Sequence, residues 1–264
     1  MSTTHDSVYY ATLGDALLGA YETGTPIAPL TSTHSGLSIE DAYAVQLHQV
    51  KRWTESGRRI VGYKVGLTSK AMQDQLGVDQ PDFGHLFDDM VLDASSPVSL
   101  DRFISPRIEP EISFVLGRDL KGPGLSREDV AEAIDHAVIS LEVIDSRIAD
   151  WKITLADTIS DNASSGALIL GEKAALDAVD LAAMPVTLKR NGETVGEGVG
   201  AAVLGHPIEG IVWLANTLGA LGTTLEAGSV VMAGSITAAV AIAPGDSIRA
   251  TFGELGDLEV TFAE

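Results

Sequence analysis

The sequence predicts an α+β fold in which an N-terminal helical cap precedes a mixed, mainly antiparallel sheet or barrel. Helical periodicity dominates residues 1–58, whereas short apolar stretches separated by turns dominate residues 59–264. Asn191-Gly192 and Pro244-Gly245-Asp246 are turns of the kind that join antiparallel neighbours. The chain also has 27 glycines and only 5% aromatic residues, which is typical of many turns and close backbone contacts. We therefore expect a helical cap at residues 1–58 and a β-rich main domain at residues 59–264.

The expected helices are marked by caps and by apolar residues at helical spacing. They cover residues 9–21, 38–57, 126–137 and 207–218. Ser38 with Asp41, and Ser126 with Asp129, have the spacing of capping boxes. His206 stands in the capping position of the last helix, directly before a proline.

Strands are expected where short apolar stretches are bounded by turn-forming residues. They cover residues 59–66, 112–116, 138–144, 186–188, 229–233, 247–252 and 258–262. Residues 22–36 and 79–84 are expected to be loops because they are rich in turn formers. The polar segment 157–166 either lines a pocket or forms a long surface loop. Many strands with few helices between them argue against a doubly wound sheet.

Composition and charge exclude several classes of site and partner. No cysteine is present, which excludes disulfides, thiolate nucleophiles and cysteine-bound zinc. The six histidines form no HxxxH or HxH pair, so a metal would be held by oxygen, which favours Mg²⁺ or Mn²⁺. A formal charge of −20 makes nucleic acid and anionic membrane poor partners. Because no stretch could span a membrane or resembles a signal peptide, we expect a cytoplasmic protein.

The most informative residues are Glu109 and Glu111, which share one face of an extended strand with Arg107. Two carboxylates that project together repel each other and usually need a cation between them. A divalent metal with oxygen ligands is the simplest such cation. A solvated face, or pairing with Arg107, is the alternative.

Glu142 is a third acidic candidate because it lies inside the apolar strand 138–144. A buried glutamate is costly without a partner. Glu109, Glu111 and Glu142 together would form a three-carboxylate metal site with open positions. The alternative is that Glu142 lies at a strand edge or pairs with Arg147.

Lys64 lies between two glycines, Gly62 and Gly66, which leave room for a ligand to approach the backbone. A lysine there can bind a carboxylate or act as an acid or base, although an exposed strand lysine is equally compatible with the pattern. Asp79 and Asp82 flank a proline, where aspartate is most often a turn former.

Five blocks of sequence, in order, resemble the 2-keto-4-pentenoate hydratases of aromatic meta-cleavage pathways. The blocks are GYKVGLT at 62–68, GVDQPDFG at 77–84, RIEPE at 107–111, LEVIDSRI at 141–148 and DNAS at 161–164. These enzymes belong to the hydratase/decarboxylase branch of the fumarylacetoacetase-like fold. The resemblance runs from about Asp41 to the C-terminus, and five blocks in order are far more specific than any one of them.

The resemblance implies a β-barrel-like core with an N-terminal helical part, and a Mg²⁺ or Mn²⁺ site formed by Glu109, Glu111 and Glu142. It also implies that Lys64 is the active-site lysine and that the pocket contains Asp79, Asp82 and Ser164. Pro110 and Ser165 depart from the family pattern, which often has Ala and Cys there. Pro110 removes a backbone N–H but leaves both neighbouring carboxylates available.

The implied reaction adds water to a 2-hydroxy-2,4-dienoate, through its 2-oxo tautomer, to give a 4-hydroxy-2-oxo acid in aromatic or steroid meta-cleavage catabolism. A metal-bound 2-oxo acid of this kind is electrophilic at carbon 4. We expect Lys64 to bind the substrate carboxylate and to assist proton transfer. Asp79 or Asp82 would activate water, and Asn162 and Ser164 would orient the substrate.

Three other functions remain open from the sequence. A 2-oxo-3-enedioate (4-oxalocrotonate) decarboxylase would use the same metal site, but no extra basic cluster for a second carboxylate is evident. A non-catalytic metal- or carboxylate-binding pathway subunit would not need Lys64. A C–C bond hydrolase usually needs a His–Glu pair, and His85 and His206 are not obviously placed for one.

The expected partners are the small anionic substrate and further copies of this chain, with a neighbouring pathway enzyme as an option. Residues 230–243 show little polar alternation, so both faces of these strands should be covered, in part by another subunit.

Overall fold

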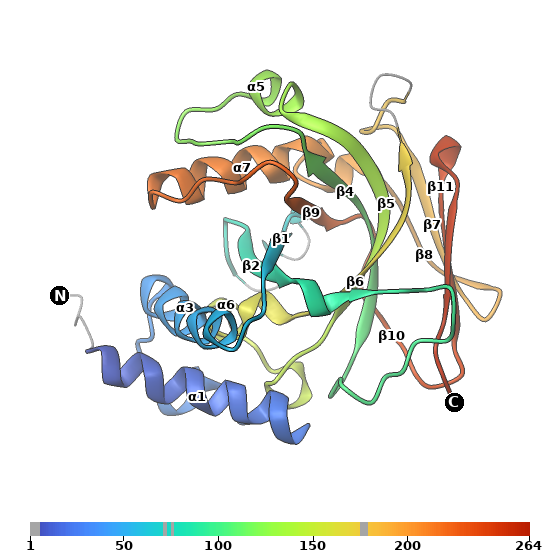
Figure 1. Ribbon diagram of the computed structural model, residues 1–264. Helices are drawn as coiled ribbons and strands as arrows, with labels where there is room; N and C mark the ends of the chain where they lie inside the picture. Colours follow the sequence, from blue (N-terminus) through green and yellow to red (C-terminus); the bar gives the residue numbers. More distant parts are fainter. Residues whose placement is uncertain (1–5, 71–72, 75–76, 175–178) are drawn as a thin grey trace.

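The computed structural model describes residues 6–70, 73–74, 77–174 and 179–264, and it shows a curled mixed sheet flanked by helices (Figure 1). The larger sheet has the strand order β2-β1-β9-β4-β5-β6-β3, with β10 paired to β4. Its strands are β1 (Ile60–Gly66), β2 (Asp82–Phe87), β3 (Val91–Leu92), β4 (Arg107–Leu116), β5 (Ile134–Ile144), β6 (Ser165–Ala174), β9 (Val230–Ser235) and β10 (Val240–Ala241). In the described part of this sheet, only β1 with β9 and β3 with β6 are parallel. The predicted α+β class with a mixed, mainly antiparallel sheet is confirmed.

A smaller antiparallel sheet, at the right of Figure 1, has the order β12-β11-β7-β8. Its strands are β7 (Pro185–Arg190), β8 (Glu193–Val199), β11 (Ser247–Phe252) and β12 (Asp257–Thr261). The predicted Asn191-Gly192 turn joins β7 to β8, and both residues have positive φ, 54° and 84°, as a tight hairpin turn requires. The sequence did not predict β8, because its mostly exposed residues are rich in glycine and glutamate and carry little apolar alternation.

The helical layer at the lower left of Figure 1 is made mainly by α1 (Ser7–Thr23) and α3 (Ile39–Glu55). The short helix α2 (Leu30–Thr33) lies between them in sequence. The predicted capping box of α3 is present, because Ser38 accepts from the Asp41 backbone and Asp41 accepts from the Ser38 backbone. Helix α6 (Leu155–Ser160), from the middle of the chain, packs against α3 and completes the layer. The boundary between residues 58 and 59 therefore stays a prediction.

Helix α7 (Pro207–Ala220) packs on β9 on the opposite side of the sheet (Figure 1). His206 caps it as predicted, since its Nδ1 accepts from the backbone N–H of Ile208 at 3.1 Å. The buried face of α7 contributes Ile211, Leu214 and Leu218 to the main apolar core, which also includes residues of both sheets. Among the described residues, no helix is long and apolar enough to cross a membrane.

Three of the segments differ from the predicted secondary structure. Residues 22–36 are not entirely a loop, because they contain the short helix α2. Residues 79–84 are not entirely a loop, because β2 begins at Asp82 and pairs with β1. The helix predicted at residues 126–137 is α5 (Arg127–Ala131) alone, and β5 begins at Ile134. Pairing with β4 recruits Ile134 and Ala137 into the sheet, so tertiary contacts override the local helical pattern.

Candidate active site

Strands β4 and β5 bring the three predicted glutamates together. Glu109 and Glu111 project from one face of β4, and the antiparallel register places Glu142 of β5 directly opposite Glu109. One carboxylate oxygen from each of the three residues lies within 4.8 Å of the others. The cluster therefore arises from strand alternation together with cross-strand register.

Burial makes this cluster electrostatically unfavourable without a cation. Glu111 and Glu142 are each only 1% exposed, and Glu109 is half-buried. Burial, followed by the charge of Glu142, raises the pKa of Glu109 to about 8. The same two causes raise the pKa of Glu111 well above its ordinary value, and burial also raises that of Glu142.

The hydrogen bonding of the cluster fits a divalent cation. Glu111 Oε2 accepts from the backbone N–H of Gly234 at 2.9 Å. Both carboxylate oxygens of Glu142 are buried, and neither accepts a well-formed hydrogen bond from the described residues. Three converging carboxylates with unsatisfied oxygens are the donor set that hard cations such as Mg²⁺ prefer. The residues present therefore fit a metal held by oxygen.

Lys64 of β1 is the cation nearest to the glutamates. Its Nζ lies 3.3 Å from Glu142 Oε1 and donates to the backbone carbonyl of Ala163 at 2.9 Å. Burial opposes the charged ammonium, but the surrounding carboxylates, chiefly Glu142, outweigh it and raise the pKa of Lys64 above its ordinary value. The lysine is 4% exposed, which excludes the exposed-strand alternative. The pairing of Glu142 with Arg147 is also excluded, because Arg147 pairs with Asp161 and Asp145.

Asp82 and Asp79, the two candidates for water activation, have different surroundings. Asp82, at the start of β2, is 2% exposed and lines the cavity beside Lys64. Its Oδ1 has no hydrogen-bond partner among the described residues, and burial raises its pKa although the charge of Lys64 opposes the shift. Asp79 is exposed and does not line the cavity. The structure thus brings Asp82 to the cluster and leaves Asp79 outside it.

The space beside Gly66 is filled by protein. A Cβ at this position would lie 2.2 Å from Asp82 Oδ1, so the glycine admits the Asp82 carboxylate. The expected room for ligand backbone contact at Gly66 is therefore occupied by a side chain of the site.

The polar segment 157–166 is buried, so the surface-loop alternative is wrong. It contains the end of α6 and a short turn at Asn162–Ser164. Ser164 and Thr158 both line the cavity, and their hydroxyl oxygens lie 3.2 Å apart. Asn162 does not line the cavity. Its amide instead pairs with the backbone N–H and C=O of His85, at 2.8 and 2.9 Å.

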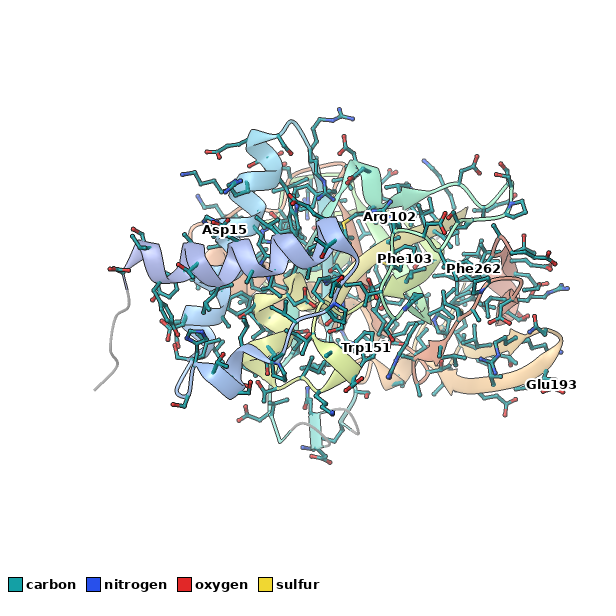
Figure 2. The ribbon with its side chains drawn as sticks, turned by 90° about the horizontal axis from the view of Figure 1, so that it is seen from below. Asp15, Arg102, Phe103, Trp151, Glu193 and Phe262 are labelled. Carbon is teal, nitrogen blue, oxygen red and sulfur yellow. The ribbon has the colours of Figure 1, made fainter. Side chains whose placement is uncertain are left out.

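These groups lie in a cavity of about 310 Å³, a size that suits a small organic acid. One wall is apolar and includes Leu67, Ile144 and Ile153. Trp151, labelled in Figure 2, lines the cavity from the segment between β5 and α6. The guanidinium of Arg107 lies 4.5 Å from the centre of the Trp151 ring. Arg107 also lines the cavity and forms no ion pair or side-chain hydrogen bond with the described residues.

Sequence reasoning missed four contributions to this site: Thr158, Trp151, the carbonyl of Ala163 and the N–H of Gly234. A backbone group carries no residue-type signal, and the contact of Gly234 with Glu111 depends on the pairing of β4 with β9. Thr158 belongs to the polar segment 157–166, so its hydroxyl was the available signal, but its contact with Ser164, six residues along the chain, depends on the turn between them.

A model of the fumarylacetoacetate hydrolase C-terminal family matches residues 58–263 of this sequence. The chain belongs to this family. Within the fumarylacetoacetate hydrolase family, it is 43% identical over 262 residues to a 2-hydroxyhexa-2,4-dienoate hydratase of Comamonas testosteroni, covering 98% of this chain and 99% of the relative. It is also 43% identical over 248 residues to a 2-keto-4-pentenoate hydratase of Paraburkholderia xenovorans, covering 94% and 92%.

Among solved structures, this family member resembles 4-oxalocrotonate decarboxylase from Pseudomonas putida G7, determined with magnesium and adipate. The TM-score is 0.95 at 38% sequence identity, over 99% of this chain and 100% of the other. A second structure of that decarboxylase, with calcium and acetate, gives a TM-score of 0.93. The resemblance stated from five sequence blocks is therefore confirmed at the level of the family and the fold.

Proposed function

We propose that this protein is a hydro-lyase that adds water to a 2-hydroxy-2,4-dienoate and forms a 4-hydroxy-2-oxo acid. The observation that carries the proposal is the three-glutamate cluster beside Lys64 and Asp82 in one small cavity. The relatives described above, named as hydratases of short dienoates and of 2-keto-4-pentenoate, support the substrate class. The pathway context is meta-cleavage catabolism.

Glu109, Glu111 and Glu142 would hold a divalent cation, with Mg²⁺ or Mn²⁺ as the proposed ion. When bound, such a cation supplies Lewis-acid polarisation of a 2-oxo acid. The carboxylates also neutralise the cation, so the substrate enters a site whose remaining positive charge lies on Lys64 and Arg107.

Lys64 is placed to act as a proton donor. In the metal-free protein the surrounding carboxylates raise its pKa and favour the charged form, and its Nζ is fixed by Glu142 and by the Ala163 carbonyl. A charged ammonium at this point can hold the substrate carboxylate and can give the proton that converts the dienol to its 2-oxo tautomer.

Asp82 is the proposed base for water. Its carboxylate is buried and lines the cavity, and its Oδ1 is free to accept a proton from the water that adds to carbon 4. The hydroxyl of Ser164 lies 3.2 Å from that of Thr158, and both residues line the cavity with Asp82, so Ser164 can orient the substrate.

Turnover of 2-hydroxypenta-2,4-dienoate tests the proposal. The reaction is followed with added Mg²⁺ or Mn²⁺, with and without chelator. We expect a 4-hydroxy-2-oxo acid with metal and none after exhaustive chelation. Calorimetric binding of Mg²⁺ without turnover of any dienoate would instead indicate a non-catalytic metal-binding subunit.

Arg107 favours a second candidate, the decarboxylation of a 2-oxo-3-enedioate. This guanidinium lines the cavity, and none of the described carboxylates pairs with it, so it could bind a second substrate carboxylate. The similarity to the 4-oxalocrotonate decarboxylase structure supports the same reading.

Release of CO₂ distinguishes the two functions. A dienoate and its dicarboxylate analogue are offered in parallel, and CO₂ is measured. For a hydratase we expect water addition to the monocarboxylate and no CO₂ from the dicarboxylate. CO₂ release that is lost in Arg107→Gln, while dienoate hydration is kept, would assign the decarboxylase activity to the Arg107 side of the cavity.

A further inference from the structure

The turn at Asn162–Ser164 has an unusual backbone. Three consecutive residues that are not glycine have left-handed φ values of 51°, 52° and 54°. L-residues visit this region rarely, and then usually singly. Such a conformation persists only where the surrounding contacts fix it, and it is concentrated at functional sites.

One side of the turn is held by Arg147, which is 1% exposed. Its Nε donates to Asp161 Oδ1 at 2.5 Å, and its backbone N–H donates to Asp161 Oδ2 at 2.9 Å. Its two terminal nitrogens donate to the carbonyls of Asp161 and Ser165, at 3.0 and 3.2 Å. The guanidinium therefore binds both Asp161, which precedes the turn, and Ser165, which follows it.

The other side of the turn is held against β2. The Asn162 amide makes two hydrogen bonds with the backbone of His85, and Ser165 Oγ donates to the Asn162 carbonyl at 2.7 Å. A Cβ on Gly84 would lie 2.3 Å from the Asn162 carbonyl oxygen, so only glycine lets β2 approach this closely. The turn is thus fixed from both sides.

The group presented by this turn is the carbonyl of Ala163, which accepts from Lys64 Nζ at 2.9 Å. The ammonium also lies 3.3 Å from Glu142 Oε1. We propose that the left-handed turn 162–164, clamped by Arg147 and Asn162, positions the Lys64 ammonium for proton transfer. Arg147 and Asn162 are then positioning residues that touch neither substrate nor metal, and the inference rests on the role proposed for Lys64.

Ala163→Gly is the sharpest test. Glycine adopts the left-handed conformation without penalty, so the variant should fold at least as stably as the parent. The carbonyl loses its fixed direction, because glycine also allows other conformations. We expect kcat for a dienoate to fall about tenfold, with KM and calorimetric Mg²⁺ affinity little changed.

Two further variants separate positioning from general stability. Asn191→Gly introduces glycine at another left-handed residue (φ 54°), in the distant β7–β8 hairpin. It also removes two side-chain hydrogen bonds, to Asp246 and Ser247, so it is the harsher structural change, and it should still leave kcat unchanged. Arg147→Lys keeps the charge but loses the fork that joins Asp161 and Ser165, so it should lower kcat in the same way. Arg147→Met would leave Asp161 unpaired and is less informative, because the protein could fail to fold.

A readout without turnover uses protein labelled with ¹⁵N-lysine, in which the buried ammonium of Lys64 gives a slowly exchanging signal that is assigned with Lys64→Arg. We expect Ala163→Gly and Arg147→Lys to broaden or remove this signal and Asn191→Gly to keep it. An unchanged signal together with a normal kcat in Ala163→Gly would overturn the inference. If Ala163→Gly loses the signal but the parent protein hydrates no dienoate, the positioning role of the turn is supported and the proposed function is rejected.

Discussion

Asp79 and Asp82 flank the same proline, yet only Asp82 reaches the cavity. The sequence gives no reason to prefer one carboxylate, because both lie in a turn-like stretch. The difference arises from pairing of β2 with β1, which places Asp82 opposite Gly66 and buries its side chain next to Lys64. At the scale of single residues, burial and partners therefore decide which candidate can do chemistry.

Replacing the two aspartates in turn tests this distinction. In Asp82→Asn we expect kcat to fall by roughly two to four decades, the usual effect of losing a general base. In Asp79→Asn, the matched change on the exposed side of Pro81, we expect near-normal kcat. Steady-state kinetics on one dienoate measures both, and equal losses would place water activation elsewhere.

Lys64 gives a second prediction at this scale. Lys64→Ala should lower kcat by roughly two to four decades, because it removes the proton donor and the partner of Glu142. Lys64→Arg keeps a positive charge but cannot give up its proton, so it should restore substrate affinity more than kcat. A Lys64→Ala enzyme with near-normal kcat would refute the role, provided that its metal content equals that of the parent.

At the scale of elements, local signals predicted the structure where local chemistry decides it. The capping box at Ser38 and the proline-initiated helix at residue 207 both appear as expected. The alternation of Glu109 and Glu111 on one strand face also holds. What could not be predicted depends on partners far away in sequence, such as the register that puts Glu142 opposite Glu109.

The backbone conformation of the turn at Asn162–Ser164 could not be predicted from local sequence either. Asparagine visits left-handed backbone fairly often, but alanine and serine seldom do. No local rule would place three such residues in succession. Their conformation depends on Arg147 and on the backbone of β2, which sequence inspection does not bring together.

The packing of β2 against α3 gives a prediction about acid stability. Gln46 Nε2 donates to the carbonyls of Phe83 and Ile159, so its Oε1 is left to accept from His85 Nδ1 at 3.1 Å. Burial lowers the pKa of His85 to about 4. As the pH falls below about 6.5, His85 of the unfolded chain becomes protonated, whereas the buried His85 of the folded protein stays neutral. This residue therefore destabilises the fold increasingly between pH 6.5 and pH 4.

We expect the free energy of unfolding to drop by about 2 kcal/mol more between pH 7 and pH 5 in the parent than in His85→Gln. Urea titrations at the two pH values measure the difference. His34→Gln, at a half-buried histidine outside this contact, serves as the control. The raised pKa values of the clustered glutamates favour the folded state as the pH falls. This contribution is the same in the parent and in the variants, so it cancels when their pH responses are compared. Identical pH responses would show that His85 is not held neutral.

At the scale of the whole molecule, stability should depend on the cation. Ligands that bind only the folded state stabilise it, by about 2.7 kcal/mol at 100 times Kd. For a domain of this size we expect Mg²⁺ at that excess to raise Tm by roughly 5 to 10 °C. Differential scanning calorimetry with and without chelator measures the shift.

Glu109→Gln should remove most of that rise without lowering the Tm of the metal-free protein, because it deletes both a ligand and a like charge. The exposed Glu193, at the remote β8 hairpin in Figure 2, provides the matched control Glu193→Gln, which should keep the full shift. A metal-induced shift that survives Glu109→Gln would move the binding site away from the cluster.

The expected homo-oligomer is the last prediction at this scale. Helix α7 of the same chain covers β9, so part of the cover expected from another subunit is intramolecular. Residues after β9 still include exposed Ala238 and Ala241. We expect a mass above that of one 27.6 kDa chain by light scattering at micromolar concentration, and a monomer would contradict this.

The pairing of Glu109 with Glu142 across β4 and β5 also has a consequence for how long the protein survives. These neighbouring strands lie near the centre of the larger sheet. A bound ion would link them, and β4 and β5 must separate for the protein to unfold. Without the ion, the same carboxylates repel across that seam. Proteases attack transiently opened chains, and cleavage follows the open population. When magnesium is scarce, the idle enzyme should be degraded faster than the loaded one, so metal supply would set its abundance as well as its activity.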